Sequence, residues 1–289
     1  MSVTQSPAVA IMQGRLLPPY EGRFQAFPAT RWREELPLAR AAGLDGIEWI
    51  YEKPGEALNP MADDAGQAEL RALCDANGVF VRSICADYYM TERLLDADAQ
   101  PVEANLRHLD QLIGRAGRFG IAYIILPFVD ASSLRAPAAV AALPGILRRL
   151  LPAARAAGVE LHLETDLPPA VFANLLAAVN DPLVKANFDI GNSASLGYDP
   201  TEELTALAPW LGSVHVKDRA LGGGTVPLGT GNADLPTCFR LIRQAGFKRW
   251  FVLQVARAAP DGADIDETAL ARINRAFVQK QWANLRQGV

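Results

Sequence analysis

The stretch Ala157-Gly158-Val159-Glu160-Leu161-His162-Leu163-Glu164 joins the end of a helical pattern to a short strand through one glycine. A glycine directly after a helix is the usual left-handed cap. The same helix–glycine–strand junction recurs at Gly43, Gly78, Gly120 and Gly246. Strands and helices that alternate at this spacing predict β-α-β units and a parallel sheet.

Eight such units occupy the 289 residues, which fits an α/β fold consisting of a single (β/α)8 barrel over residues 1–289. The predicted strands are Ala8–Gln13, Asp45–Tyr51, Val79–Ala86, Ile121–Phe128, Val159–Glu164, Val184–Asp189, Ser213–Lys217 and Trp250–Val255. The predicted helices are Trp32–Ala42, Gln67–Asn77, Glu103–Phe119, Ala138–Ala157, Ala170–Val179, Thr201–Ala208, Thr237–Ala245 and Glu267–Leu285. A doubly wound sheet is the alternative, but it would carry a glycine-rich phosphate turn after its first strand, and Gln13-Gly14-Arg15-Leu16-Leu17 is not one.

Composition narrows the class of protein further. A net charge of −4 with 50% hydrophobic and 21% charged residues excludes a wholly disordered chain and weighs against a partner such as duplex DNA. No run of 18 apolar residues predicts a membrane span, and the first dozen residues lack the basic start of a signal peptide. The three cysteines are odd in number and far apart, so they predict no disulfide framework. We therefore expect a cytoplasmic protein.

Polar residues end the inward face of four successive strands. Side chains alternate between the two faces of a strand, and in the last four strands the Val, Leu, Ala and Phe residues suit the helix side. The opposite face then ends with Glu164, Asp189, His215 and Gln254. Active sites of barrel enzymes lie at these C-terminal strand ends, and buried carboxylates need a partner or a metal. The pattern predicts one divalent ion with mixed nitrogen and oxygen ligands, which fits Mn²⁺, Co²⁺, Zn²⁺ or Mg²⁺.

Over nearly its whole length the sequence resembles the xylose-isomerase-like barrels, the sugar (phosphate) isomerase/epimerase superfamily. The segments that carry the resemblance are Met12-Gln13-Gly14-Arg15-Leu16, Gly46-Ile47-Glu48, Leu161-His162-Leu163-Glu164, Phe188-Asp189-Ile190-Gly191-Asn192 and Val214-His215-Val216-Lys217-Asp218. The resemblance implies a metal-dependent enzyme of carbohydrate metabolism, often using manganese. Glu, Asp, His and a final Glu hold the metal in such members, and the two Glu residues move protons between substrate carbons. It also allows a homo-oligomer.

One of these four positions departs from the family pattern, because Gln254 stands where an epimerase would carry Glu. An amide oxygen can bind a metal but cannot exchange a proton. With Glu164 as the remaining base, we expect an aldose–ketose isomerase acting on a sugar or sugar phosphate through an enediol. A second acid such as Asp87 or His162 would instead favour the alternative, a ketose 3-epimerase. A keto-polyol dehydratase and a non-catalytic sugar-binding relic also remain open.

Further residues near the predicted strand ends are expected to support the substrate. Lys217 would hydrogen-bond a hydroxyl or stabilise enediolate charge, which makes it a second catalytic candidate. Guanidinium groups are suited to a phosphate or carboxylate, and the carboxylates nearby to sugar hydroxyls. The predicted substrate contacts are Arg15, Glu48, Asp87, His162, Asn192, Arg219 and Arg257. His162 has an equal alternative as a buried, hydrogen-bonded histidine, and each arginine as an ordinary ion pair.

An apurinic-site endonuclease is a rival from another class, because the related barrel fold serves such enzymes. These nucleases hold three metals through many histidines. This chain has three His in total, and Asn192 stands where the nuclease motif of the sixth strand would offer another. The sequence therefore disfavours a nuclease.

Overall fold

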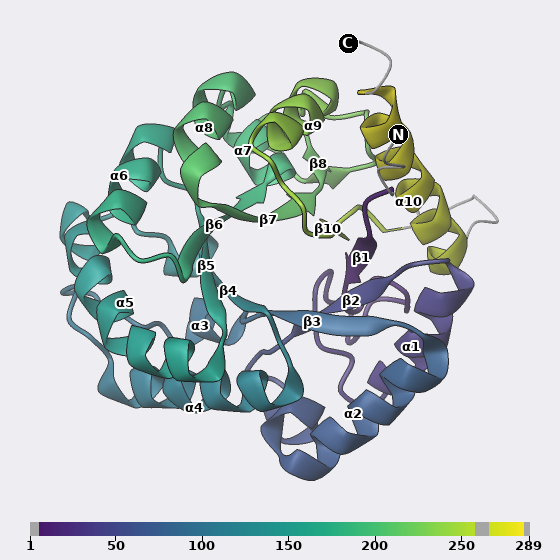
Figure 1. Cartoon of the computed structure of the whole chain (residues 1–289), viewed down its shortest axis with the longest axis horizontal. Coiled ribbons are helices and arrows are strands. Elements are labelled where there is room, and N and C mark those ends of the chain that lie inside the picture. Colours follow the sequence, from purple (N-terminus) through teal and green to yellow (C-terminus); the bar gives the residue numbers. More distant parts are fainter. Residues whose placement is uncertain (1–5, 258–265, 286–289) are drawn as a thin grey trace.

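A computed structural model describes residues 6–257 and 266–285 of the chain (Figure 1). Its strands form a closed parallel barrel in the order β1-β10-β7-β6-β5-β4-β3-β2. The barrel strands are β1 (Val9–Met12), β2 (Gly46–Ile50), β3 (Phe80–Cys85), β4 (Tyr123–Phe128), β5 (Glu160–Thr165), β6 (Val184–Asp189), β7 (Leu211–Val216) and β10 (Phe251–Leu253). The predicted (β/α)8 fold is confirmed.

Helices follow the strands, and most of them form a layer around the outside of the barrel, as Figure 1 shows in a view down the shortest axis of the molecule. They are α1 (Trp32–Ala41), α2 (Asp64–Asn77), α3 (Tyr88–Thr91), α4 (Glu103–Phe119), α5 (Pro137–Ala157), α6 (Pro169–Val179), α7 (Ile190–Leu196), α8 (Pro200–Leu207), α9 (Leu235–Gln244) and α10 (Glu267–Asn284). The eight predicted helices are all present. The sequence patterns did not predict α3 and α7, which are short helices directly after strand ends. Within the described residues, no helix combines the length and the apolar character needed to cross a membrane.

Apolar residues explain how strands and helices pack. Leu161 and Leu163 on β5, like Val214 and Val216 on β7, are fully buried against the helix layer. A side chain of this size contributes about 1.5–3 kcal/mol when it is removed from water. The glycines after α2, α4 and α5 adopt positive φ angles, as predicted for left-handed caps. Each cap stops its helix and returns the chain to the next strand.

The loop after β7 is built around one buried carboxylate. Asp218 begins a small hairpin of β8 (Asp218–Arg219) and β9 (Thr225–Val226), whose strands pair antiparallel. Its side chain accepts hydrogen bonds from the backbone N–H groups of Gly229, Gly231 and Ala233. A Cβ atom at Gly231 would lie 2.2 Å from Asp218 Oδ1, so glycine is required there. These hydrogen bonds fix the conformation of the loop after β7.

Candidate metal centre and active site

Three strands that are neighbours in the barrel bring two carboxylates and one imidazole together. Glu164 on β5, Asp189 on β6 and His215 on β7 each offer a ligand atom, and these atoms all lie within 4.8 Å of one another. The three residues are buried, and Asp189 pairs in register with His215. Buried carboxylates are costly unless they are paired or bound to a cation. Two carboxylates and an imidazole are a donor set that could hold a divalent metal ion.

Asp189 shows how the local sequence directs an oxygen at this cluster. It ends β6 and caps α7, where its Oδ1 accepts a hydrogen bond from the backbone N–H of Asn192 at 2.8 Å. The other oxygen, Oδ2, is buried and accepts no hydrogen bond among the described residues. Burial alone would raise the pKa of Asp189, but the charges of Lys217 and His215 lower it to about 2. An ionised oxygen that lacks a hydrogen-bond donor fits a cation site.

His215 is oriented by a carboxylate behind it. Its Nε2 lies 2.7 Å from Glu48 Oε1, while Nδ1 lies 3.4 Å from Glu164 Oε2 and 3.7 Å from Asp189 Oδ2. With the proton on Nε2 donated to Glu48, the lone pair of Nδ1 faces the cluster, an arrangement typical of metal-binding histidines. Burial would lower the pKa of His215, but Glu48 and the two cluster carboxylates raise it overall. Glu48 is fully buried and does not line the cavity, which corrects its predicted substrate contact.

Two amides hold the oxygens of Glu164. Asn187 Nδ2 donates to Oε2 at 2.9 Å, and Asn192 Nδ2 donates to Oε1 at 2.7 Å. Neutral donors fix the plane of a carboxylate without giving it a counter-charge. Glu164 therefore stays oriented and able to accept either a cation or a proton.

Lys217 and Gln254 complete one side of the cluster. Lys217 Nζ donates to Gln254 Oε1 and to Asn192 Oδ1, both at 3.1 Å, and lies 3.5 Å from Asp189 Oδ2. Gly191 gives the lysine its room, because a Cβ atom there would lie 2.6 Å from Lys217 Cγ. Gln254 Oε1 and Asp189 Oδ2 share one cationic neighbour. The amide oxygen of Gln254 is thus linked to the three-residue cluster through Lys217.

A cavity of about 420 Å³ opens on this cluster, a size typical of small-molecule sites. The predicted site residues on its wall are Glu164, Lys217, Gln254, Asp87, Asn192 and Arg219. Sequence reasoning missed Gln25, Glu52, Cys85 and Asp130, which also line it. Glu52 and Asp130 lie within two residues of the ends of β2 and β4, so position alone could have indicated them. Gln25 lies in an irregular loop and carries no such signal.

Two predicted phosphate ligands, Arg15 and Arg257, do not line the cavity. Arg15 is 2% exposed and donates to the carbonyl of Phe24 and to Gln25 Oε1. Arg257 donates to three backbone carbonyls of the loop that follows β1. Burial, together with the charge of Arg257, lowers the pKa of Arg15 to about 9. These guanidinium groups are used to hold the loop in place, which corrects their predicted role.

His162 lies deeper in the barrel than the cluster. Its Nε2 is 2.9 Å from Glu160 Oε2 and its Nδ1 is 2.8 Å from Ser213 Oγ. The ring stacks on Tyr123, with the centroids 4.2 Å apart. Burial lowers the pKa of His162 to about 4, so the imidazole is neutral near pH 7. His162 does not reach the cavity, which corrects the predicted substrate contact in favour of the buried histidine.

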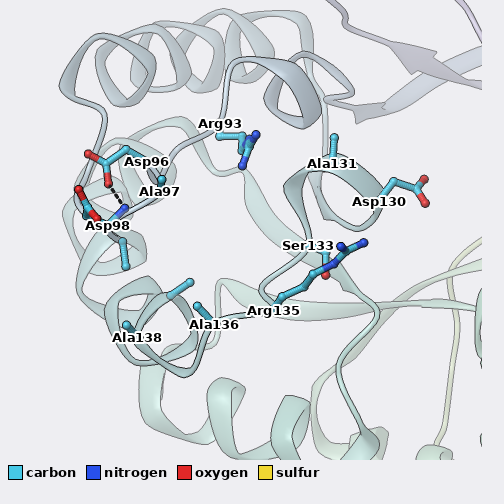
Figure 2. Close-up of a pocket in the computed structure, with 12 residues that line it drawn as sticks. Arg93, Asp96, Ala97, Asp98, Asp130, Ala131, Ser133, Arg135, Ala136 and Ala138 are labelled. Carbon is cyan, nitrogen blue, oxygen red and sulfur yellow. Dashed lines mark hydrogen bonds between the residues drawn. The ribbon is translucent and has the colours of Figure 1, made fainter.

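A second hollow of about 800 Å³ adjoins the first, because Asp130 and Ala131 line both. Figure 2 shows that Arg93 and Arg135 enter it from different segments, the loop after α3 and the segment before α5. Neither guanidinium has a hydrogen-bond or ion-pair partner among residues 6–257 and 266–285. Both guanidinium groups are therefore unpaired within the described part of the chain, in a hollow that Asp96, Asp98 and Asp130 also line. No sequence motif distinguishes the two arginines from other surface arginines.

A (β/α)8 barrel with a buried Glu–Asp–His cluster under an open cavity defines the class of protein, a barrel enzyme with the donor set for a divalent cation. More specifically, the chain belongs to the Xylose isomerase-like TIM barrel family, whose profile matches residues 36–279. This confirms the resemblance that the sequence motifs indicated.

Curated relatives cover most of the chain. It is 29% identical over 225 residues to 2-epi-5-epi-valiolone 7-phosphate 2-epimerase from Actinoplanes sp., a match that covers 74% of this chain and 80% of that protein. It is 28% identical over 260 residues to L-ribulose-5-phosphate 3-epimerase UlaE from Escherichia coli, over 86% of this chain and 90% of that one. The predicted enzyme class, isomerases in the broad sense that includes epimerases, is confirmed.

Solved structures share the fold. A xylose isomerase-like barrel protein from Mycobacterium smegmatis in complex with magnesium gives a TM-score of 0.69 at 19% identity, covering 97% of this chain and 98% of that one. L-ribulose 3-epimerase gives a TM-score of 0.73 at 19% identity, with coverage of 97% and 96%. At this level of identity the likeness supports the architecture alone.

Proposed function

We propose that this protein is a divalent-metal-dependent epimerase of phosphorylated ketoses, with Glu164 as the base that removes the proton next to the carbonyl. The observation that carries the proposal is an oriented carboxylate, Glu164, on the wall of a cavity and beside the buried Asp189–His215 pair. Both curated relatives are named as epimerases of sugar phosphates. They favour the epimerase over the aldose–ketose isomerase that Gln254 led us to expect.

The cofactor that we propose is one divalent ion. Glu164, Asp189 and His215 would hold it, with Gln254 Oε1 as a fourth donor. When bound, the ion would polarise the ketose carbonyl and stabilise the charge that develops on its oxygen. We propose Mn²⁺ first, with Mg²⁺, Co²⁺ and Zn²⁺ as alternatives, and the magnesium complex of the M. smegmatis protein supports a divalent ion.

The side chains around Glu164 suit proton transfer. Glu164 takes the proton from the carbon, the C–H electron pair forms the C=C bond of an enediolate, and the carbonyl oxygen takes the negative charge. Asn187 and Asn192 hold the carboxylate in one plane during this step. The ammonium of Lys217 lines the same cavity and would donate a hydrogen bond to the developing oxyanion.

The phosphate would bind in the adjoining hollow. Arg219 lines the inner cavity, but it donates to the carbonyl of Gly223 and to Asn192 Oδ1. Arg93 and Arg135 keep their donors free among the described residues, and a guanidinium binds phosphate through paired N–H groups. We therefore assign the phosphate end of the substrate to these two residues in place of Arg15 and Arg257.

Incubation with a panel of ketoses and ketose phosphates in deuterated buffer with Mn²⁺, followed by NMR, tests this function. An epimerase gives a diastereomeric ketose with deuterium at the inverted carbon. An aldose product would instead establish the isomerase, and loss of water the dehydratase. If the protein takes up no metal and exchanges no hydrogen with any substrate of the panel, the sugar-binding relic is the correct interpretation.

A further inference from the structure

Inversion at a carbon by proton transfer needs one group on each face of the substrate. Glu164 supplies one of these two groups. The corresponding position after β10 carries the amide of Gln254, which can neither take nor give a proton near neutral pH. If the protein is an epimerase, a second acid–base group must come from another wall of the cavity. The inference that follows rests on the proposed function.

Four carboxylates line the cavity: Glu52, Asp87, Asp130 and Glu164. Two of them, Glu52 and Asp130, are unsuited to act as the second acid–base group. Glu52 is bound at both oxygens, to Arg23 Nη1 at 2.7 Å and to the backbone N–H of Phe27 at 2.6 Å, so it is a neutralised structural group. Asp130 is exposed at the rim, where it also lines the outer hollow. Asp87 is then the remaining carboxylate besides Glu164 in the described cavity wall.

Asp87 lies on a different wall of the cavity from Glu164, and its hydrogen-bond partners are not members of the metal-binding cluster. It follows β3, which lies two places from β5 and three places from β10 around the closed barrel. Its Oδ2 accepts a hydrogen bond from Gln25 Nε2 at 2.8 Å, and its Oδ1 accepts one from the thiol of Cys85 at 3.1 Å. Neutral donors thus orient the carboxyl group of Asp87, just as neutral amides orient that of Glu164.

Gln25 connects Asp87 to the position where the family carries its second glutamate. Gln25 Oε1 accepts from Gln254 Nε2 at 3.0 Å, while Gln25 Nε2 donates to Asp87. From Gln254 the contacts continue through Lys217 and Asn192 to Glu164. Asp87 and Glu164 are therefore the two ends of one hydrogen-bonded chain of side chains along the cavity wall.

We propose that Asp87 is the second catalytic acid–base residue of this protein and replaces the glutamate that Gln254 lacks. After Glu164 has taken the proton, the carboxylic acid form of Asp87 gives its proton to the same carbon from the other face. The C=C electron pair forms the new C–H bond, and the oxyanion returns its electrons to the C=O bond. Glu164 ends protonated and Asp87 ionised, and proton exchange with water restores both.

The environment of Asp87 matches this double use. The pKa of Asp87 is raised to about 6. Burial is the largest cause, the hydrogen bonds from Gln25 and Cys85 oppose it, and the charges of Glu52 and Glu164 act in the same direction as burial. A carboxyl group with a pKa near the working pH is present in both protonation states. An ordinary surface aspartate would be ionised throughout and could only accept a proton.

Asp87→Asn separates the two half-reactions. The amide keeps the acceptor that Gln25 needs but cannot donate a catalytic proton. In deuterated buffer with Mn²⁺ and the ketose phosphate found active, we expect inversion to fall at least about 100-fold, the usual scale of an acid–base residue. Deuterium should still enter the starting epimer, with retained configuration, within about tenfold of the wild-type rate. Asp110→Asn, which removes an exposed aspartate of α4 that lines neither the cavity nor the adjoining hollow, should leave both rates within about threefold.

A double variant decides the result even if the single variant is damaged. In Asp87→Asn/Gln254→Glu the carboxylate is moved to the family position, and inversion should recover at least about tenfold over Asp87→Asn alone. The assignment is overturned if Asp87→Asn inverts the substrate at the wild-type rate, or if it loses exchange and inversion together and the double variant restores neither. A wild-type protein that exchanges no hydrogen in any ketose phosphate overturns the proposed function itself, and the assignment of Asp87 with it.

Discussion

The barrel interior holds two polar clusters built from the same residue types at different depths. The lower cluster contains Glu160 and His162 at the start of β5, and the upper cluster contains Glu164, Asp189 and His215 at the strand ends. In the lower cluster both Glu160 oxygens lie within 2.8 Å of Arg249 Nη2. In the upper cluster an oxygen of Asp189 has no hydrogen-bond donor among the described residues.

Charge balance explains the difference between the two clusters. In the lower cluster, the carboxylate of Glu160 pairs with the guanidinium of Arg249 and the imidazole of His162 stays neutral, so the charges of this cluster balance. Above, Glu48, Glu164 and Asp189 surround His215, and Lys217 Nζ lies 3.5 Å from Asp189 Oδ2. These three carboxylates outnumber the two basic groups even when His215 is protonated. A buried excess of negative charge is stable when a further cation joins it. Residue types alone therefore do not separate structure from site, whereas the balance of charges and hydrogen bonds does.

The comparison is tested most strongly by Glu164→Gln. The amide keeps the shape of the carboxylate but cannot accept the substrate proton, so we expect the loss of deuterium exchange from the starting epimer and at least a ~1000-fold fall in turnover, about 4 kcal/mol in activation free energy. The melting temperature should change little, because the hydrogen bond lost to Asn187 or Asn192 is offset by the removal of one charge from a buried excess of negative charge. Exchange that persists in the variant would show that another group is the base.

The lower cluster should make the free energy of unfolding depend on pH, through the titration of His162. The pKa of His162 is about 4 in the folded chain and 6.5 without burial. Because the folded value is the lower one, its contribution to stability is complete above pH 6.5 and is lost as the pH falls toward 4. The loss approaches about 3 kcal/mol. Urea unfolding of the wild type and of His162→Gln between pH 7.5 and pH 4 checks this, since the gap between the two free energies should narrow in acid; parallel curves would contradict it.

Glu160→Gln is the structural counterpart of Glu164→Gln on the same strand. It leaves Arg249 without its counter-charge in a part-buried setting, where the side chains are 30% and 22% exposed. We expect the free energy of unfolding to fall by about 1–3 kcal/mol, with turnover per folded molecule unchanged. Thermal unfolding and steady-state kinetics on both variants give a crossed pattern. A Glu160→Gln protein that is stable but inactive would place the chemistry in the wrong cluster.

The alternation of residues on strands predicted much of this from sequence. Glu164, Asp189 and His215 converge as expected. Every second side chain of a barrel strand points to the interior, so inward residues at the ends of neighbouring strands come close together. Glu48, Arg15 and Arg257 could not be assigned in this way. Their roles depend on which neighbour accepts or donates the hydrogen bond. That neighbour is an imidazole three strands away around the barrel for Glu48, and backbone carbonyls of the loop after β1 for the two arginines.

Gln254→Glu asks whether the upper cluster accepts one more charge, and its effect should be the smallest. If Gln254 Oε1 is the fourth donor, a carboxylate there should tighten Mn²⁺ binding about tenfold, or about 1.4 kcal/mol, because Lys217 at 3.1 Å will compete for the added charge. Calorimetric titration measures this without reference to activity. Gln25→Glu is the matched control, since it adds the same charge one hydrogen bond farther away and should change the affinity much less. Equal affinities in the wild type and in Gln254→Glu would mean that three residues alone complete the metal centre and that Gln254 serves only to position Lys217 and Gln25.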